Sequence, residues 1–96
     1  MSESLDSIRN LDDLRAFVHK QLCDRENILQ DQFRLSETVL IRSGKDCGMH
    51  FWVLGPRSIR LEAIWETDRN TIYFYDARGV RYMKFQLPQR LAVCSA

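Results

Sequence analysis

The sequence contains no apolar run long enough to span a membrane. Its longest apolar stretch, residues 49–55, is interrupted by His50, whereas a transmembrane helix needs about 20 predominantly apolar residues. Residues 1–10 also lack the basic start and the apolar segment of a secretory signal. We therefore expect a cytoplasmic protein that has no membrane partner.

Neither sign of charge is in excess. Fourteen Lys and Arg residues stand against thirteen Asp and Glu residues, which gives a formal net charge of +1. A nearly neutral chain has no long-range field that would attract a nucleic acid or an anionic surface. Any charged partner would therefore have to bind a local patch of side chains.

Cysteine is scarce and odd in number. Cys23, Cys47 and Cys94 cannot all pair with one another, and a chain of this size can bury a core without disulfides. We expect the thiols to be reduced. The composition, 45% hydrophobic and 28% charged, is typical of a globular protein, and 96 residues suffice for one core.

An N-terminal helix is the first element that the sequence predicts. Asn10 is a suitable N-cap, and Asp12 and Asp13 follow it where carboxylates favour the positive end of a helix dipole. Residues 1–10 are expected to be loosely ordered, and residues 24–31 either prolong the helix or connect it to the next element. Apolar residues recur at helical spacing and predict a helix over residues 11–23; they are Leu11, Leu14, Phe17, Val18 and Leu22.

After residue 33 the apolar period changes from helical to alternating. Turn residues between the alternating segments, beginning with residues 43–46, indicate short hairpin connections and hence antiparallel neighbours. The prediction is a single α+β domain over residues 11–88, with one N-terminal helix packed on a five-stranded, mostly antiparallel meander sheet, followed by a short C-terminal tail over residues 89–96. The strands are expected within residues 33–42, where a break near Ser36 and Glu37 is left open, and at 49–54, 59–66, 71–75 and 80–87.

The third and fourth predicted strands indicate which face is the core. A four-residue loop between them places Trp65 opposite Ile72, with Phe74 on the same face. These residues are expected beneath the helix. Tyr73 and Tyr75 then lie on the other face of the sheet.

The turn before the fifth strand decides which charges flank the tyrosines. Gly79 suits the left-handed position that closes a three-residue loop. That loop pairs Tyr75 with Arg81 and Tyr73 with Met83. Two further residues are then expected on the face away from the tyrosines: Tyr82 and Lys84.

Two Cys/His pairs have the ligand count of a zinc site. His19 and Cys23 are four residues apart in the predicted helix, and Cys47 and His50 follow beyond the first strand. The helical pair, however, lies on the side away from the apolar stripe, and zinc modules usually occur in chains too short for a core of their own. We expect no metal ion and no other cofactor.

Cys47 and His50 are also the nearest candidates for a nucleophile and its base. Residues three apart on a strand point to opposite faces, so Cys47 would have to lie in the preceding turn to meet the His50 ring. No third residue is identifiable that would orient the histidine. A small enzyme with a Cys/His site is therefore the third hypothesis, and no catalytic residue is assigned.

Partial cover of the sheet suggests the first hypothesis. A helix of about thirteen residues is roughly 20 Å long and about 10 Å wide, so it covers only part of a five-stranded sheet about 24 Å across. Residues 49–54 are apolar on both faces of their strand, which needs further cover from the sheet itself or from another chain. We expect a non-catalytic protein-interaction or assembly module that binds another protein or forms a homodimer. The expected binding residues are Trp52, Tyr73, Tyr75, Arg60 and Arg81.

Single-stranded nucleic acid is the alternative partner. The same tyrosines, with Arg60, Arg81 and Lys84, could form a basic aromatic surface that stacks bases. The order of predicted strands differs from that of a βαββαβ nucleic-acid domain, and an RNP-type motif is absent. Because the net charge is also close to zero, nucleic acid ranks below protein.

Overall fold

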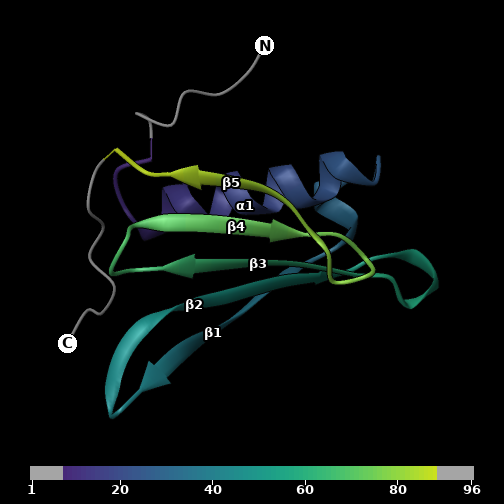
Figure 1. The fold of residues 1–96 in the computed structure, drawn as a ribbon. Helices are drawn as coiled ribbons and strands as arrows, with labels where there is room; N and C mark the ends of the chain where they lie inside the picture. The colour runs from purple at the N-terminus through teal and green to yellow at the C-terminus, as the bar shows by residue number, and fades with distance from the viewer. Residues whose placement is uncertain (1–7, 89–96) are drawn as a thin grey trace.

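The computed structural model describes residues 8–88 and places one helix against one sheet (Figure 1). Helix α1 spans Leu11–Arg25. Neighbouring strands are antiparallel throughout, and their order in the five-stranded sheet is β1-β2-β3-β4-β5. The predicted α+β meander is therefore confirmed. The strands are β1 (Leu35–Arg42), β2 (Lys45–Leu54), β3 (Arg60–Glu66), β4 (Thr71–Tyr75) and β5 (Arg81–Gln86).

The predictions for residues 1–7 and for the tail over residues 89–96, with Cys94, lie outside the described residues. Ile8 belongs to the segment expected to be loosely ordered, yet it is only 2% exposed and is part of the hydrophobic core. Two short 3-10 turns, Gln30–Gln32 and Pro56–Ser58, connect the longer elements. Within residues 8–88, no helix has both the length and the apolar character needed to cross a membrane.

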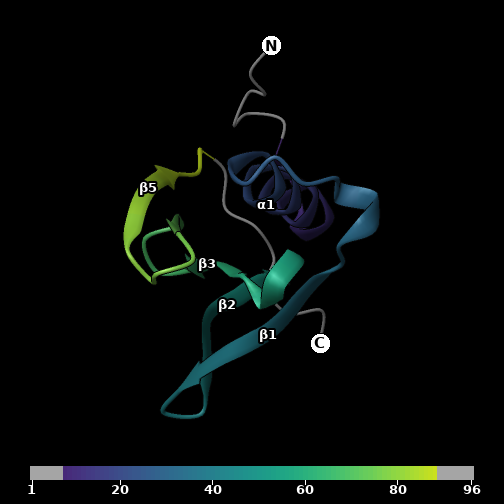
Figure 2. The same cartoon turned by 90° about the vertical axis from the view of Figure 1, so that its right-hand side faces the viewer.

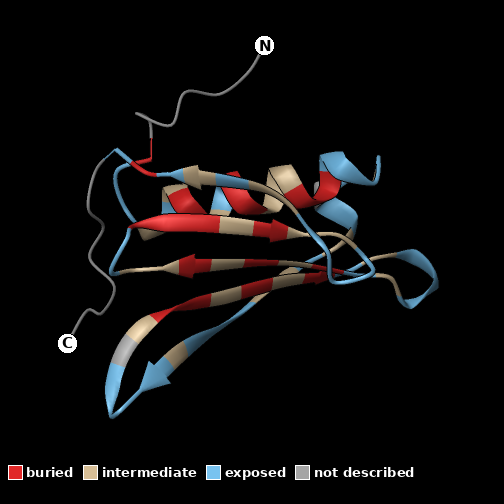
Figure 3. Cartoon of the chain, viewed as in Figure 1, coloured by how far each residue is buried: buried red, intermediate tan, exposed pale blue. Residues whose placement is uncertain are grey.

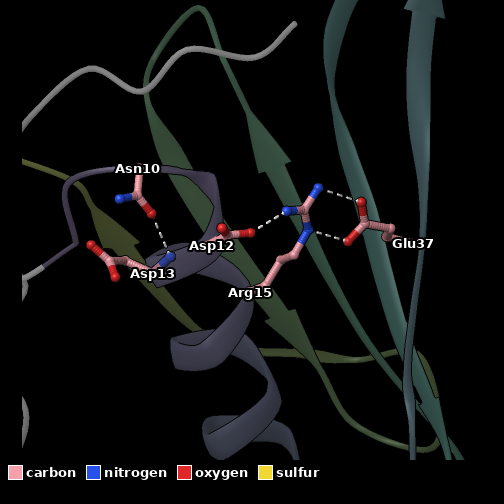
Figure 4. Close-up of polar contacts among 5 residues, drawn as sticks. All are labelled: Asn10, Asp12, Asp13, Arg15 and Glu37. Atoms are coloured by element: carbon pink, nitrogen blue, oxygen red, sulfur yellow. Dashed lines mark hydrogen bonds and ion pairs between the residues drawn. The ribbon is translucent and has the colours of Figure 1, made fainter. Parts of the chain in front are cut away.

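Helix α1 begins at the predicted cap. The Asn10 side chain accepts a hydrogen bond from the Asp13 backbone N–H at 2.8 Å (Figure 4). The Asp13 carboxylate in turn accepts one from the Arg9 N–H at 3.1 Å, one residue before the cap. The helix continues past its predicted end at Cys23 to Arg25, so the first part of the open segment prolongs the helix.

The core lies between α1 and one face of the sheet. Trp65 and Phe74 are fully buried there, as predicted. The Phe17 ring of the helix packs edge to face on Phe74, with 6.2 Å between the ring centroids. Trp65 lies opposite Ile72 in the register of β3 and β4, which confirms the four-residue loop. Buried and half-buried residues alternate along β3, so only one of its faces is part of the core (Figure 3).

A buried hydrogen-bond chain fixes the loop between β3 and β4. The Trp65 indole N–H donates to the Asn70 side-chain oxygen at 3.0 Å, and the Asn70 amide nitrogen donates to the Leu87 carbonyl at 3.3 Å. Asn70 has a φ of 48°, a left-handed conformation that asparagine adopts more readily than most residues. The loop thereby ties the end of β5 to the core tryptophan.

The hairpin of β1 and β2 is longer than predicted, because its turn is tighter. Ser43 and Gly44 have φ values of 55° and 78°, the signature of a two-residue type I′ turn. Pairing therefore continues to Arg42 and Lys45 rather than stopping for a four-residue loop. β1 also runs without a break through the segment where an interruption was left open.

A β-bulge interrupts this hairpin near its middle. Leu40 pairs with Gly48, whereas Ile41 pairs with Asp46, so Cys47 is an extra residue of β2. In a regular strand the Cys47 side chain would point to the same face as Met49, and the bulge turns it to the opposite face. The predicted second strand begins at residue 49 and does not include the bulge.

The loop before β5 has the predicted glycine geometry. Gly79 has a φ of 82°, and the Asp76 backbone N–H donates to the Val80 carbonyl at 3.0 Å. The Asp76 carboxylate accepts hydrogen bonds from the N–H groups of Arg78 and Val80. The bond from Val80 is the main reason that the pKa of Asp76 is lowered.

The register of β4 and β5 is only partly as predicted. Tyr75 lies opposite Arg81, as expected, but a second bulge follows immediately. Tyr73 therefore lies opposite Lys84, and the predicted pairing of Tyr73 with Met83 is wrong. A shift of one residue exchanges the faces of a strand, so Lys84 lies on the same face as the tyrosines and not on the opposite one.

Tyr82 is the extra residue of this second bulge and stays on the helix side, as predicted. Its ring packs against Phe74, and the Arg25 guanidinium lies 4.1 Å from the ring centroid. Within the described chain the buried Tyr82 hydroxyl has no hydrogen-bond partner. Burial raises the pKa of Tyr82, because the charged phenolate is poorly solvated there.

Tyr82→Phe is expected to raise the free energy of unfolding by about 1 kcal/mol at neutral pH, because it removes a buried hydroxyl without a partner. The gain should grow as the pH rises above 10.0, the ordinary pKa of tyrosine. Because the pKa of Tyr82 is higher in the folded than in the unfolded state, the unmodified protein loses stability as the phenol ionises. The Tyr82→Phe variant has no phenol to ionise and does not lose stability in this way. Urea unfolding at neutral and alkaline pH measures both effects, with half-exposed Tyr75→Phe as control. Lower stability of Tyr82→Phe at neutral pH would contradict the assignment.

Candidate functional site

One face of the sheet is uncovered. We call it the open face: the face opposite α1, over which no helix or strand of residues 8–88 lies (Figure 2). Its residues alternate with the buried core residues along each strand. It carries Ser36, Thr38 and Leu40 of β1, His50, Trp52 and Leu54 of β2, Arg60, Glu62, Ile64 and Glu66 of β3, Tyr73 and Tyr75 of β4, and Arg81 and Lys84 of β5.

A first cluster on the open face surrounds Trp52. The Arg60 guanidinium lies 5.3 Å from the centroid of the Trp52 ring, and the His50 ring lies 5.0 Å from it. His50 Nε2 and Glu62 Oε1 are 2.7 Å apart, and the second Glu62 oxygen lies 3.9 Å from Arg60 Nε. These contacts hold the tryptophan between two nitrogen-bearing side chains, with a carboxylate beside both.

A second cluster surrounds Tyr73. The Arg81 guanidinium lies 4.8 Å from the centroid of the Tyr73 ring. The Tyr73 hydroxyl donates to Glu66 Oε1 at 3.4 Å, and Arg69 Nε lies 3.9 Å from the same oxygen. Tyr75 lies beside this cluster, opposite Arg81. The cluster therefore combines the rings of Tyr73 and Tyr75 with one carboxylate and two guanidinium groups.

The structure places all five predicted binding residues on the open face, in these two clusters. The aromatic residues of the two clusters lie on either side of β3, because Glu62 lies between Trp52 and Tyr75 and Ile64 lies between His50 and Tyr73 in the register. The three aromatic side chains are half-buried by their neighbours, whereas Arg60 and Arg81 are exposed.

A shallow hollow of about 240 Å³ adjoins the tyrosines at one end of the open face. Sequence reasoning missed most of its lining, since the contributing residues come from the edge strand, the first bulge and the loop after β3. The change of apolar phase around Cys47 and Gly48 is the one local signal that could have suggested the bulge. The lining residues are Leu40, Arg42, Cys47, Ile64, Trp65, Glu66, Asp68, Arg69, Tyr73 and Tyr75.

The two Cys/His pairs do not converge. His19 Nε2 lies 2.6 Å from the Phe33 carbonyl oxygen, while His50 contacts Glu62 on the open face. Cys23 is buried on the other side of the sheet. No group of three or more potential metal ligands is found among residues 8–88.

The predicted position of Cys23, on the side of the helix away from the apolar stripe, is wrong. The chain folds back over the last turn of α1, since the Glu26 and Ile28 N–H groups both donate to the Cys23 carbonyl. Ile28 then packs against the core beside it. Burial raises the pKa of the Cys23 thiol, with a smaller contribution from Asp24.

Cys47 and His50 both face the open side, although residues three apart on a regular strand would point to opposite faces. The bulge at Cys47 is the reason, because the extra residue reverses the alternation between the two. Among residues 8–88 no hydrogen bond joins the two side chains, and His50 instead contacts Glu62 and Trp52. The geometry therefore presents a half-exposed thiol beside the hollow and a histidine held elsewhere.

Protein-family models, curated proteins and solved structures were compared with this chain, and none of them matches it. The function must therefore be argued from the site. The fold and the site together define a small α+β domain in which one face of the sheet is uncovered and carries aromatic and charged side chains.

Proposed function

We propose that this chain is a non-catalytic protein-interaction module that binds a protein partner through the open face. The observation that carries the proposal is the pair of arginine–aromatic stacks, Arg60 on Trp52 and Arg81 on Tyr73. Tryptophan, tyrosine and arginine are the residues most enriched in the energetic centres of protein interfaces. The cytoplasm stays the proposed location.

The charges of the open face favour a protein over a phosphate backbone. Each aromatic cluster contains a carboxylate: Glu62 lies 3.9 Å from Arg60 in the first, and Glu66 lies 3.9 Å from Arg69 in the second. A phosphate backbone would be repelled by these carboxylates, whereas a protein surface can place its own cations and anions against such a mixed patch. The stacked rings would also have to shed their arginines to stack on bases.

The hollow beside Tyr73 supports the same proposal. Ile64 and the tyrosine rings give it apolar walls, while Arg69 and Glu66 supply polar groups at its margin. Interface anchors are typically single large side chains that enter a pocket of this kind. We expect one partner side chain to occupy it.

Binding is tested by expressing the tagged full chain in its native cells and quantifying the co-purified proteins by mass spectrometry. Trp52→Ala/Tyr73→Ala should lower the recovery of a specific partner about tenfold or more, as expected for truncated interface anchors. Leu29→Ala truncates an exposed apolar side chain in the connection between α1 and β1 and should leave recovery unchanged. A set of partners that is the same for all three proteins would overturn the proposal.

Single-stranded nucleic acid remains the second candidate, and Lys84 beside Tyr73 is the observation that favours it. Fluorescence anisotropy with a labelled single-stranded oligonucleotide separates the two. Affinity that falls steeply with added salt, and that is lost in Arg81→Ala/Lys84→Ala, would favour nucleic acid. Absence of salt-sensitive binding would leave the protein partner as the better proposal.

A further inference from the structure

Strand β1 forms one edge of the sheet and has few of the features that usually protect an edge. Within the described chain it pairs only with β2, so its outer backbone groups have no strand beside them. Natural edge strands are commonly short or bulged, or carry proline, lysine or a charged residue that points toward the core. β1 has eight residues, contains neither proline nor lysine, and continues regularly while the bulge falls in β2. Its charged residue on the helix side, Glu37, is bound by Arg15 within the same chain.

The half of β1 that lies nearest the turn to β2 also exposes apolar side chains. Arg15 of α1 reaches the strand at Glu37, where it donates to both carboxylate oxygens at 2.6 and 2.9 Å (Figure 4). Beyond that point, on the same side of the sheet, Val39 is 42% exposed and Ile41 is 66% exposed. Leu40 lies on the opposite side, at the margin of the hollow. The strand thus presents an apolar segment on both faces next to a free backbone edge.

We propose that β1 pairs antiparallel with β1 of a second copy of this chain, which joins the two five-stranded sheets into one continuous sheet about a twofold axis. The proposal is independent of the open-face function, because it uses the edge of the sheet rather than its face. The self-complementarity of the strand argues for a second copy as the occupant.

Twofold pairing brings residues of the same face opposite each other, which leaves few registers. An axis at Thr38 would place Arg34 opposite Arg42 of the partner subunit, and like charges directly opposite are destabilising. An axis at Val39 would place Ile41 opposite Glu37, a carboxylate already bound to Arg15. The first register pairs apolar residues only where Leu35 lies opposite Ile41, and the second only where Val39 lies opposite its own copy, so each leaves the other apolar side chains opposite polar ones.

An axis at Leu40 satisfies the apolar pattern. It places Val39 opposite Ile41 of the partner subunit on the helix side, and Leu40 opposite its own copy on the open side. Thr38 then lies opposite Arg42, so no like charges are paired. The geometry points to this register, in which the apolar segment of each edge is covered by the other.

Sedimentation velocity of the full chain over a range of concentrations tests the proposal. Because the contact is limited to one strand from each copy, we expect a reversible dimer with a dissociation constant on the order of 10 μM. Val39→Lys/Ile41→Lys places lysine opposite lysine and should weaken the dimer about tenfold or more. Leu29→Lys, at a side chain that is similarly exposed, is the matched control and should dimerise like the unmodified protein.

A charge pair tests the register itself. Val39→Glu/Ile41→Lys places each introduced glutamate opposite an introduced lysine when the axis lies at Leu40, so dimerisation should recover and become sensitive to salt. With an axis at Val39, two introduced glutamates would face each other and no recovery would follow. Thermal unfolding checks that each variant is folded.

Three results would overturn the proposal. They are a monomeric unmodified protein at all concentrations, a dimer that Val39→Lys/Ile41→Lys leaves intact, and a folded Val39→Glu/Ile41→Lys variant that stays monomeric. A dimer that is lost instead in Trp52→Ala/Tyr73→Ala would assign self-association to the open face.

Discussion

Phe74→Ala is expected to lower the free energy of unfolding by about 3 to 5 kcal/mol, through lost burial and the cavity that the ring leaves. Phe74 is 0% exposed, and its ring makes edge-to-face contacts with Phe17 at 6.2 Å and Phe85 at 6.1 Å between centroids. These rings come from α1 and β5, so the surroundings cannot easily collapse into the space. Equilibrium unfolding in urea, followed by circular dichroism, measures the change.

Tyr75→Ala is the matched control for this experiment. It removes an aromatic side chain from the adjacent position of β4, on the open face, where the side chain is only half-buried. Its cost should be clearly smaller than that of Phe74→Ala. A cost under about 1 kcal/mol for Phe74→Ala would mean that the ring is not in a packed core and that the faces of the sheet are reversed.

Gly48→Ala should destabilise the protein by about 3 kcal/mol, an effect of overpacking rather than of backbone conformation. A Cβ atom at Gly48 would lie 2.1 Å from the Trp65 carbonyl oxygen and 3.2 Å from its carbonyl carbon. Both are backbone atoms of the neighbouring strand, so β2 and β3 would have to separate locally. The midpoint of urea unfolding reports the loss.

Gly55→Ala provides the comparison. There the nearest atom to an added Cβ is the flexible end of the Ile28 side chain at 3.4 Å. The backbone of Gly55 has a φ of −86°, which alanine adopts without strain. The two alanine variants should therefore differ strongly, and equal stabilities would contradict the assigned approach of β3 to Gly48.

Much of the fold follows from local patterns in the sequence. The Asn10 cap, the strict alternation from Leu61 to Trp65 and the short loops between strands each act within a few residues, so they can be read without knowing the tertiary contacts. Together they predict the order and direction of the strands. The burial of Trp65 and Phe74 follows from the same patterns.

The positions of the two bulges could not be predicted in this way, and a packing contact accounts for the second of them. Tyr82 leaves the ladder where its ring can pack beneath Arg25 at the end of α1, a contact between distant parts of the chain. The adjacent apolar residues Tyr82 and Met83 do indicate that the alternation shifts by one residue there. Alternation alone, however, does not say at which residue the bulge forms. The bulge reverses the predicted face of Lys84.

In the candidate site, too, some features follow from local sequence patterns and others from tertiary contacts. The faces of Trp52, Tyr73 and Tyr75 follow from alternation and are on the open face as predicted. Arg42 and Arg69 contribute to the hollow only because a hairpin arm and a loop meet at one end of the sheet. Such a meeting is a tertiary contact, which the alternation within a single strand does not encode.

The meander order has a consequence for how the chain acquires its structure. Every strand pairs with its neighbour in the sequence, so the sheet needs only the closure of short hairpin loops, which is rapid. The helix differs, because α1 precedes the strands on which it packs. During synthesis its apolar stripe, including Leu14, Val18 and Leu22, emerges from the ribosome before those strands exist. Phe17 of the helix also packs on Phe85 of β5, so the nascent chain is most exposed to aggregation and to chaperone capture between the synthesis of α1 and that of β5.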